Sequence, residues 1–183
     1  MFIQTEQTPN PATLKFLPGR VVMDHGTADF PASDSAGGSP LARRLFDVTG
    51  VERVFLGSDF VTVTKSANED WQVLKPAILG AIMEHYTSGE PVIETAAAAS
   101  AEAAGDDDEV VTQIKELLET RVRPAVAQDG GDITFEGFRD GIVYLHMQGS
   151  CSGCPSSTAT LKMGIENLLR HYVPEVVEVR SVA

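Results

Sequence analysis

The chain has 183 residues, enough for one or two domains, and its hydrophobic content of 43% is ordinary for a globular protein. Its net charge is -12: residues 1–90 and 108–183 each carry 7 Lys/Arg against 11 Asp/Glu, and residues 91–107 carry none against 4. No basic cluster that would neutralise phosphates stands out, so the composition disfavours nucleic-acid binding and electrostatic docking on an anionic membrane.

Targeting and membrane signals are also missing from the sequence. The apolar runs fall far short of the roughly 20 residues of a membrane span, and the first residues form neither a basic nor an apolar leader. We therefore expect a cytoplasmic protein with no membrane partner, although a matured mitochondrial form would show the same features. Two cysteines are too few for a disulfide-stapled secreted scaffold, and a close pair is more typical of metal or redox chemistry.

Residues 1–90 predict a first small α+β domain. Leu14 and Phe16 alternate with polar residues after a proline-containing turn, which predicts a strand. Residues 26–40 are rich in Gly, Pro, Ser and Asp and predict a loop. Residues 41–46 follow with the apolar spacing of a short helix.

The same domain is expected to continue with a hairpin and a longer helix. Residues 51–55 and 60–63 flank a Gly-containing turn, which predicts paired strands. Apolar residues then recur at helical spacing over 71–86, and we expect the helix to be capped by Asn68. Pro76 is expected to kink this helix or to mark its start.

Residues 91–107 predict a flexible, Ala-rich, acidic linker. From Thr95 to Ala104 the chain holds no large apolar residue. Such a segment cannot bury enough surface to offset the entropy lost when it becomes ordered. The predicted fold class is therefore α+β, with two small α+β domains joined by this linker.

Residues 108–183 predict the second domain. An amphipathic helix begins near Asp108 and is expected to kink or end at Pro124. After it we expect a strand at 133–136, a hairpin turn at 139–141 and a second strand at 142–147. The cysteine loop at 149–155, a helix at 161–172 and a last strand at 176–179 are expected to follow.

The only two cysteines, Cys151 and Cys154, lie between a predicted strand and a predicted helix. Pro155 suits the first position of that helix, whose N-terminus stabilises a thiolate at Cys154. Gly149 and Gly153 leave room for backbone amides to approach the sulfurs. We therefore expect both thiols to be readily deprotonated and available as metal ligands.

Two thiolates are half of the set that a Cys-only zinc site or a 4Fe-4S cluster takes. Two copies of the chain supply four, so one interpretation is a metal or cluster shared between chains. A thiol-disulfide oxidoreductase that cycles through a Cys151–Cys154 disulfide stays open, although a hairpin precedes the pair here in place of the βαβ pattern of such enzymes. Cysteines that serve only as small loop residues are the third possibility.

Other candidate residues favour structural roles. His146 alternates with its apolar neighbours in a strand and is expected to be half exposed. Lys162 and Arg170 are expected to be solvated helix charges, and residues 129–132 a glycine-rich exit from a helix into a strand. The first domain contains no catalytic motif and no phosphate loop, which favours a partner-binding module, and no catalytic residue is predicted.

The motifs around the cysteines carry a family resemblance. Residues 149–166, GSCSGCPSSTATLKMGIE, resemble the signature of the NifU C-terminal domain, and residues 129–133, DGGDI, resemble that family's second marker. Residues 8–16, TPNPATLKF, are similar to the start of the Nfu N-terminal domain. Both predicted domains are covered, in the order found in Nfu-type iron–sulfur proteins.

The resemblance implies a non-enzymatic iron–sulfur cluster scaffold or carrier. It implies a labile 4Fe-4S cluster held by Cys151 and Cys154 from each of two subunits, so that these residues are both the metal ligands and the cofactor-binding residues. The implied partners are a second copy of the chain, apo iron–sulfur client proteins and upstream assembly proteins. The extra cysteine-rich domains of the larger nitrogen-fixation members find no counterpart in this sequence, which favours cluster transfer over assembly from iron and sulfide.

Overall fold

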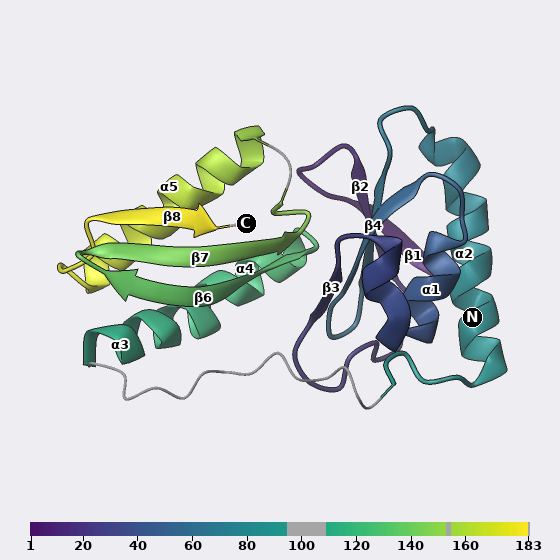
Figure 1. Cartoon of the computed structure of the whole chain (residues 1–183), viewed down its shortest axis with the longest axis horizontal. Helices are drawn as coiled ribbons and strands as arrows, with labels where there is room; N and C mark the ends of the chain where they lie inside the picture. The colour runs from purple at the N-terminus through teal and green to yellow at the C-terminus, as the bar shows by residue number, and fades with distance from the viewer. Residues whose placement is uncertain (95–108, 153–154, 183) are drawn as a thin grey trace. The chain divides into compact units, whose positions relative to one another are not determined.

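The computed structural model describes residues 1–94, 109–152 and 155–182, without the side chains of 155–157. The chain divides into two compact units, residues 1–101 and 102–183, and each combines a sheet with helices (Figure 1). The predicted α+β class is therefore confirmed. The predicted linker lies mostly on residues 95–108, outside the described residues, and the domain boundaries 1–90, 91–107 and 108–183 stay predictions.

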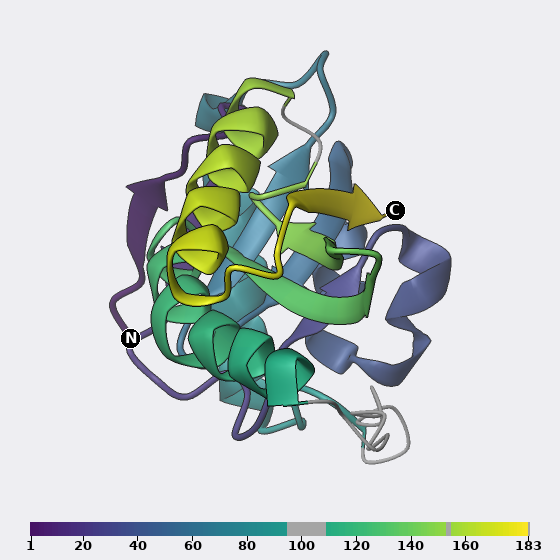
Figure 2. The ribbon, with the colours of Figure 1, turned by 90° about the vertical axis from the view of Figure 1, so that its left-hand side faces the viewer.

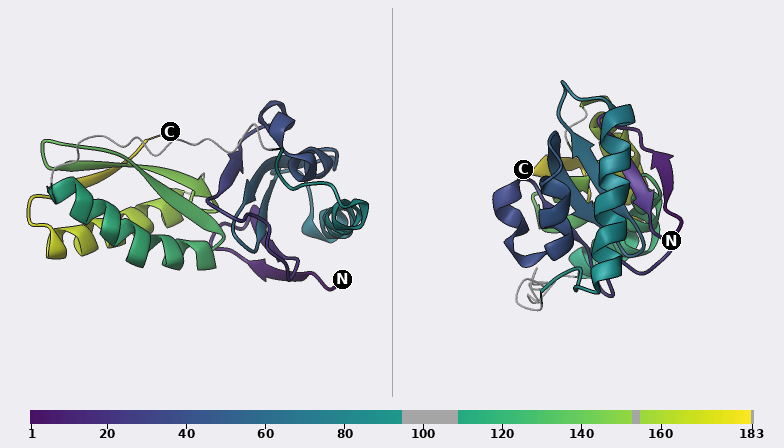
Figure 3. Two further views of the ribbon diagram at one scale, coloured as in Figure 1. Left: turned by 90° about the horizontal axis from the view of Figure 1, so that it is seen from below. Right: turned by 90° about the vertical axis from the view of Figure 1, so that its right-hand side faces the viewer.

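The first unit is a five-stranded antiparallel sheet in the order β1-β2-β5-β4-β3. Helices α1 and α2 lie on the same face of this sheet (Figure 3, right). The elements are β1 (Gln4–Gln7), β2 (Thr13–Leu17), β3 (Ala28–Phe30), a 3₁₀ segment η1 (Ser33–Gly38), α1 (Pro40–Phe46), β4 (Val51–Leu56), β5 (Val61–Lys65) and α2 (Trp71–Ser88).

Apolar periodicity explains how this unit closes. Phe16 of β2 and Val63 of β5 are buried at the centre of the sheet. Leu74, Ile78 and Ile82 of α2 recur every four residues, so they form one stripe that packs into the same core. The predicted strand at Leu14 and Phe16 and the predicted β4–β5 hairpin are both present.

Three local predictions for the first unit are wrong. The helix cap is Asp70, whose carboxylate accepts a hydrogen bond of 2.8 Å from the Gln72 amide, and not Asn68. Pro76 does not mark the start of α2, which begins at Trp71; the helix includes this proline because its missing N–H would have bonded to the carbonyl of Gln72, in the exposed first turn where water can reach it. The predicted loop over 26–40 contains β3 and η1, because β3 gains its hydrogen bonds by pairing with β4.

The second unit is a three-stranded sheet in the order β6-β7-β8. Strands β6 and β7 are antiparallel and β8 runs parallel to β7. Helices α3, α4 and α5 lie on one face of this sheet (Figure 2; Figure 3, left). The elements are α3 (Glu109–Leu117), a π-helical turn η2 (Leu118–Val122), α4 (Arg123–Gln128), β6 (Gly131–Arg139), β7 (Ile142–Gly149), α5 (Pro155–Tyr172) and β8 (Glu178–Val182).

Turn chemistry and one proline shape this second unit. A hairpin turn is present where it is predicted, at 139–141, but Arg139 pairs with Ile142 and only Asp140 and Gly141, with φ of 53° and 78°, form the turn, since positive φ at both positions matches the twist of the paired strands. The π-helical turn ends at Val122, two positions before Pro124. A proline ring clashes with the carbonyl four residues earlier, and the wider π turn relieves that clash while the chain stays helical.

The core of the second unit joins all of its layers. Ile114 of α3, Leu145 of β7 and Leu169 of α5 are fully buried in one cluster, which also includes Cys151. Among the described residues, no helix combines the length and apolarity needed to cross a bilayer.

Candidate functional site

The candidate site begins where β7 ends and α5 starts. Gly149 is the last residue of β7, and Cys151 follows in the turn that leads toward α5. Cys154 lies outside the described residues, so the structure places only the first thiol of the predicted pair. The hydroxyl groups of Ser156 and Ser157, which belong to the same motif, are likewise outside the described side chains.

Cys151 is buried. Only 5% of the residue is exposed, and it is part of the hydrophobic core of the second unit. Burial raises the pKa of this thiol to about 12. The Asp129 and Asp132 carboxylates add to the shift, whereas the Ser150 hydroxyl opposes it. The prediction that this thiol is readily deprotonated is therefore wrong for the structure described, because the sulfur is packed among apolar groups.

The glycine-rich segment of the second motif lies directly against the cysteine turn. Gly131 pairs with Gly149 across β6 and β7, and the Ser150 amide donates to the Gly130 carbonyl at 3.2 Å. The Ser150 hydroxyl donates to the Asp129 carbonyl. The two motifs that stand apart in the sequence therefore form one site.

An ion pair anchors this segment to the helices. Arg123 of α4 donates two hydrogen bonds of 2.9 Å to the Asp132 carboxylate, and these bonds raise the pKa of the guanidinium. Asp132 is buried and also accepts from the Ile133 amide at 2.8 Å. Arg123 makes a second ion pair, at 2.7 Å, with the exposed Glu119. The two hydrogen bonds between Arg123 and Asp132 fix both the distance and the orientation of the carboxylate at the start of β6.

Arg123 escaped the sequence analysis for a physical reason. It lies nine positions before Asp132, and the segment between them includes a helix end and a turn, so no helical or strand spacing links the two. A basic residue just before Pro124 carries no local signature of a buried partner. The only available signal was the acidic Asp132 directly before the predicted strand 133–136, because an acidic residue that becomes buried needs a counter-charge.

On the far side of the turn, the start of α5 holds Cys151 by its backbone. The Thr158 hydroxyl donates to the Cys151 carbonyl at 3.1 Å. The Ser152 amide and hydroxyl both donate to the Gly149 carbonyl, at 3.2 and 3.0 Å. The turn is thus hydrogen-bonded to itself, to α5 and to the β6 side.

The remaining candidates have structural partners. His146 is half buried, on the strand face opposite the buried Leu145 and Met147, as predicted. Lys162 lies 3.7 Å from Glu178, and Arg170 lies 3.6 Å from Glu166. Within the described residues, no group of three or more His, Cys, Asp or Glu side chains is placed to hold a metal ion.

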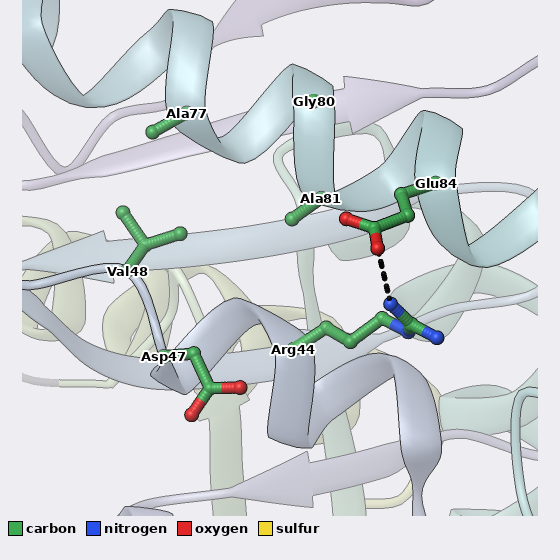
Figure 4. A pocket seen from close by; sticks show the side chains of 7 residues that line it. All are labelled: Arg44, Asp47, Val48, Ala77, Gly80, Ala81 and Glu84. Atoms are coloured by element: carbon green, nitrogen blue, oxygen red, sulfur yellow. Dashed lines mark ion pairs between the residues drawn. The ribbon is translucent and has the colours of Figure 1, made fainter.

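The first unit has a surface pocket between α1 and α2. An ion pair of 3.0 Å joins Arg44 to Glu84 across it, and α2 also contributes the small residues Ala77, Gly80 and Ala81 to its wall (Figure 4). Its lining residues are Arg44, Asp47, Val48, Ala77, Gly80, Ala81 and Glu84. The lining contains no thiol or imidazole, so it offers no soft metal ligand, and its charged side chains are those of Arg44, Asp47 and Glu84.

Comparison with known proteins shows similarity over both units. A family model described as "Scaffold protein Nfu/NifU N terminal" matches residues 3–89, and one described as "NifU-like domain" matches residues 114–180. A solution NMR structure of a NifU-like protein from Saccharomyces cerevisiae aligns with 52% of this chain and 86% of its own, at 29% identity and a TM-score of 0.47.

Similar full-length proteins come from plants and animals. The Arabidopsis thaliana protein named "NifU-like protein 4, mitochondrial" is 59% identical over 181 residues, which cover 96% of this chain and 64% of the plant protein. The Homo sapiens protein named "NFU1 iron-sulfur cluster scaffold homolog, mitochondrial" is 53% identical over 183 residues, covering 100% of this chain and 72% of its own length. The chain thus spans less than two thirds of this plant relative.

Proposed function

Because the chain belongs to the Nfu/NifU family, we propose that it is an iron–sulfur cluster scaffold and carrier, in which Cys151 and Cys154 are the cluster ligands. The cluster is its cargo and not a resident cofactor. The protein binds a labile 4Fe-4S cluster between two subunits and transfers it to apo-proteins without catalysing a reaction of its own.

Ligand number supports sharing between two chains. The chain contains 2 cysteines in all, whereas a 4Fe-4S cluster takes four thiolates. Within the described residues no cluster of His, Asp or Glu side chains completes the set. A second copy supplies the two missing sulfurs, which makes the protein a homodimer across the cluster.

One observation of the structure carries the proposal. Cys151 stands at the junction of β7 and α5, and the adjacent Ser150 is tied to Asp129 and Gly130 of the second motif. These two segments lie within the region matched by the NifU-like model.

A cluster divided between two chains suits a carrier. Separation of the chains, or exchange of one cysteine for a thiolate of the recipient, releases it. We assign recipient apo-enzymes and upstream assembly proteins as partners of the second unit. The first unit is assigned to partner binding, since its sequence contains no recognised catalytic motif.

For location, we predict a cytoplasmic protein from the sequence, and a matured mitochondrial form would show the same sequence features. The names of the plant and human relatives place those proteins in mitochondria. Fractionation of cells that express the native protein distinguishes the two compartments.

Anaerobic reconstitution of the full chain with iron and sulfide tests the function. We expect about one 4Fe-4S cluster per two chains, with broad visible absorption, and a cluster-bound dimer by sedimentation. C151A and C154A should each abolish cluster binding, whereas H146A, which removes the neighbouring imidazole, should retain it. The loaded protein should then restore activity to an apo 4Fe-4S enzyme.

Three outcomes would contradict the proposal. A complete cluster retained on a strictly monomeric chain would show that the ligand set is not shared. Zinc in place of iron, with no visible absorption, would identify a zinc-bridged structural dimer. Turnover of a Cys151–Cys154 disulfide without metal would identify an oxidoreductase.

A further inference from the structure

The sulfur of Cys151 occupies a place that only a glycine at position 131 leaves free. A Cβ on Gly131 would overlap Cys151 Sγ, and it would also lie 2.9 Å from the Gln148 carbonyl oxygen and 3.1 Å from the Cys151 amide. The Gln148 carbonyl and the Cys151 amide lie on either side of the last residue of β7, so a Cβ at position 131 would press on this backbone as well as on the sulfur. A side chain at position 131 and a buried Cys151 sulfur therefore exclude each other.

The buried position of the sulfur is held by bonds and not only by packing. Ser150, which is itself buried, bonds through its amide to Gly130 and through its hydroxyl to the Asp129 carbonyl. On the other side, Thr158 of α5 bonds to the Cys151 carbonyl. The turn around Cys151 is therefore anchored both to β6 and to α5.

This position conflicts with the task of a shared ligand. Four sulfurs from two chains must converge on one cluster, each in direct contact with iron. The sulfur of a cysteine that is only 5% exposed and packed in the core of its own chain cannot make that contact. The turn must therefore change its conformation before Cys151 can bind a cluster.

We propose that Gly131 is a positioning residue, which lets the apo chain store the Cys151 sulfur inside its core, and that release of the turn at 149–152 precedes cluster binding. The inference rests on the proposed function, which makes Cys151 a ligand. When the cluster leaves, the turn closes again and withdraws the sulfur. The apo chain is thereby protected from oxidation and from capture of the wrong metal at this thiol.

Thiol labelling of the apo chain tests this inference. In a C154S variant Cys151 is the only thiol, and its reaction with iodoacetamide is followed by mass spectrometry. We expect the folded chain to react at least about tenfold more slowly than the same chain unfolded in urea at the same pH, because reaction requires local opening. Equal rates in the two states would overturn the inference.

Substitution of Gly131 supplies the second test. In the C154S background, G131A should raise the labelling rate at least about tenfold, because the added methyl group displaces the sulfur. G137A is the matched control: it lies on the same strand, and its Cβ would meet nothing within 4 Å. A G131A chain that folds and labels as slowly as the control contradicts the proposal.

A third measurement needs no substitution at position 131 and covers the case in which G131A does not fold. Labelling of the C154S chain at low urea should be independent of urea concentration, as expected for a local opening of the turn. Labelling that follows the urea dependence of global unfolding would show that the turn does not open by itself.

These experiments contain neither iron nor sulfide, so their outcome is separate from that of reconstitution. If Cys151 is protected but the wild-type chain binds no cluster, the proposed carrier function is wrong and the proposed storage of the sulfur is supported. If the cluster assembles on a chain whose Cys151 reacts freely with iodoacetamide, the carrier function is supported and the proposed storage of the sulfur is wrong.

Discussion

Among single residues of the first unit, His85 stands out because it is fully buried and neither ring nitrogen has a hydrogen-bond partner among the described residues. Its burial lowers the pKa of the imidazole. Arg44 adds to this effect, and Glu90 opposes it. The Tyr86 ring, the nearest aromatic neighbour, packs edge-on at 5.4 Å. The folded state therefore holds His85 in its neutral form.

This environment predicts an acid-sensitive first unit. The pKa of His85 is lower in the folded state than the value of about 6.5 in the unfolded chain, so below that pH the unfolded chain binds more protons. Stability is thus full above about pH 6.5 and is lost as the pH falls from there toward the folded pKa. The urea midpoint, followed by the fluorescence of the only tryptophan, Trp71, should decrease between about pH 8 and pH 5.

H85L is the control, since it fills the site without a titratable group. The chain has 4 histidines, so the readout is the difference between the two pH profiles. If H85L shows the same loss of stability as the wild type, His85 is not its source.

At the cysteine site, the Arg123–Asp132 pair leads to a prediction for the second unit. D132A leaves the partly buried Arg123 without its main partner, and we expect a loss of about 3 kcal/mol in the free energy of unfolding by urea. E119Q removes only the exposed partner of the same guanidinium and should lose less than about 0.5 kcal/mol. Similar losses in both variants would mean that the buried pair does not stabilise the start of β6.

At the scale of elements, α2 shows how a cap decides where a helix begins. Asp70 has extended backbone angles and bonds to the Gln72 amide, so it satisfies one of the free N–H groups of the first turn. The predicted cap, Asn68, is exposed and lies two residues earlier. Both residue types are good caps, and the tertiary contacts of Trp71, whose indole donates to the Pro11 carbonyl at 3.1 Å, favour the later start.

The cap assignment is directly testable. D70A should lower the free energy of unfolding of the first unit by about 1 kcal/mol, whereas N68A should leave it unchanged within a few tenths. Urea unfolding followed by Trp71 fluorescence measures both. A larger effect of N68A would return the cap to the residue that the sequence suggested.

At the scale of the whole molecule, charge is the dominant feature. Each chain carries -12, and the excess is not confined to one segment. Two such chains that meet across a thiolate-ligated cluster repel each other at long range. Screening by salt shortens that repulsion to about 10 Å at 0.1 M.

We therefore expect salt to strengthen the cluster-bound dimer. Sedimentation of the reconstituted protein should give a dissociation constant several-fold lower at about 200 mM than at about 20 mM sodium chloride. The apo chain at the same concentrations is the control. If salt weakens the dimer, attractive ion pairs between the chains outweigh the net repulsion.

The local part of this architecture could be predicted from the sequence. The α2 stripe of Leu74, Ile78 and Ile82 and the Asp140–Gly141 turn depend on residues within one or two turns of each other. Hydrophobic periodicity and permissive turn residues are sufficient to encode them. The exposed edge strand β1 gave no such signal, because it owes its conformation to pairing with β2.

The sequence by itself determined the α+β class, the faces of the helices and the two motifs of the cysteine site. Only the tertiary structure decided that Gly131 lies against Cys151, that Arg123 pairs with Asp132 and that Cys151 is buried with a raised pKa. The reason is physical: the thiol's protonation depends on what surrounds it in space. Those surroundings come from β6, β7 and α5, which meet at the cysteine turn only after the chain has folded.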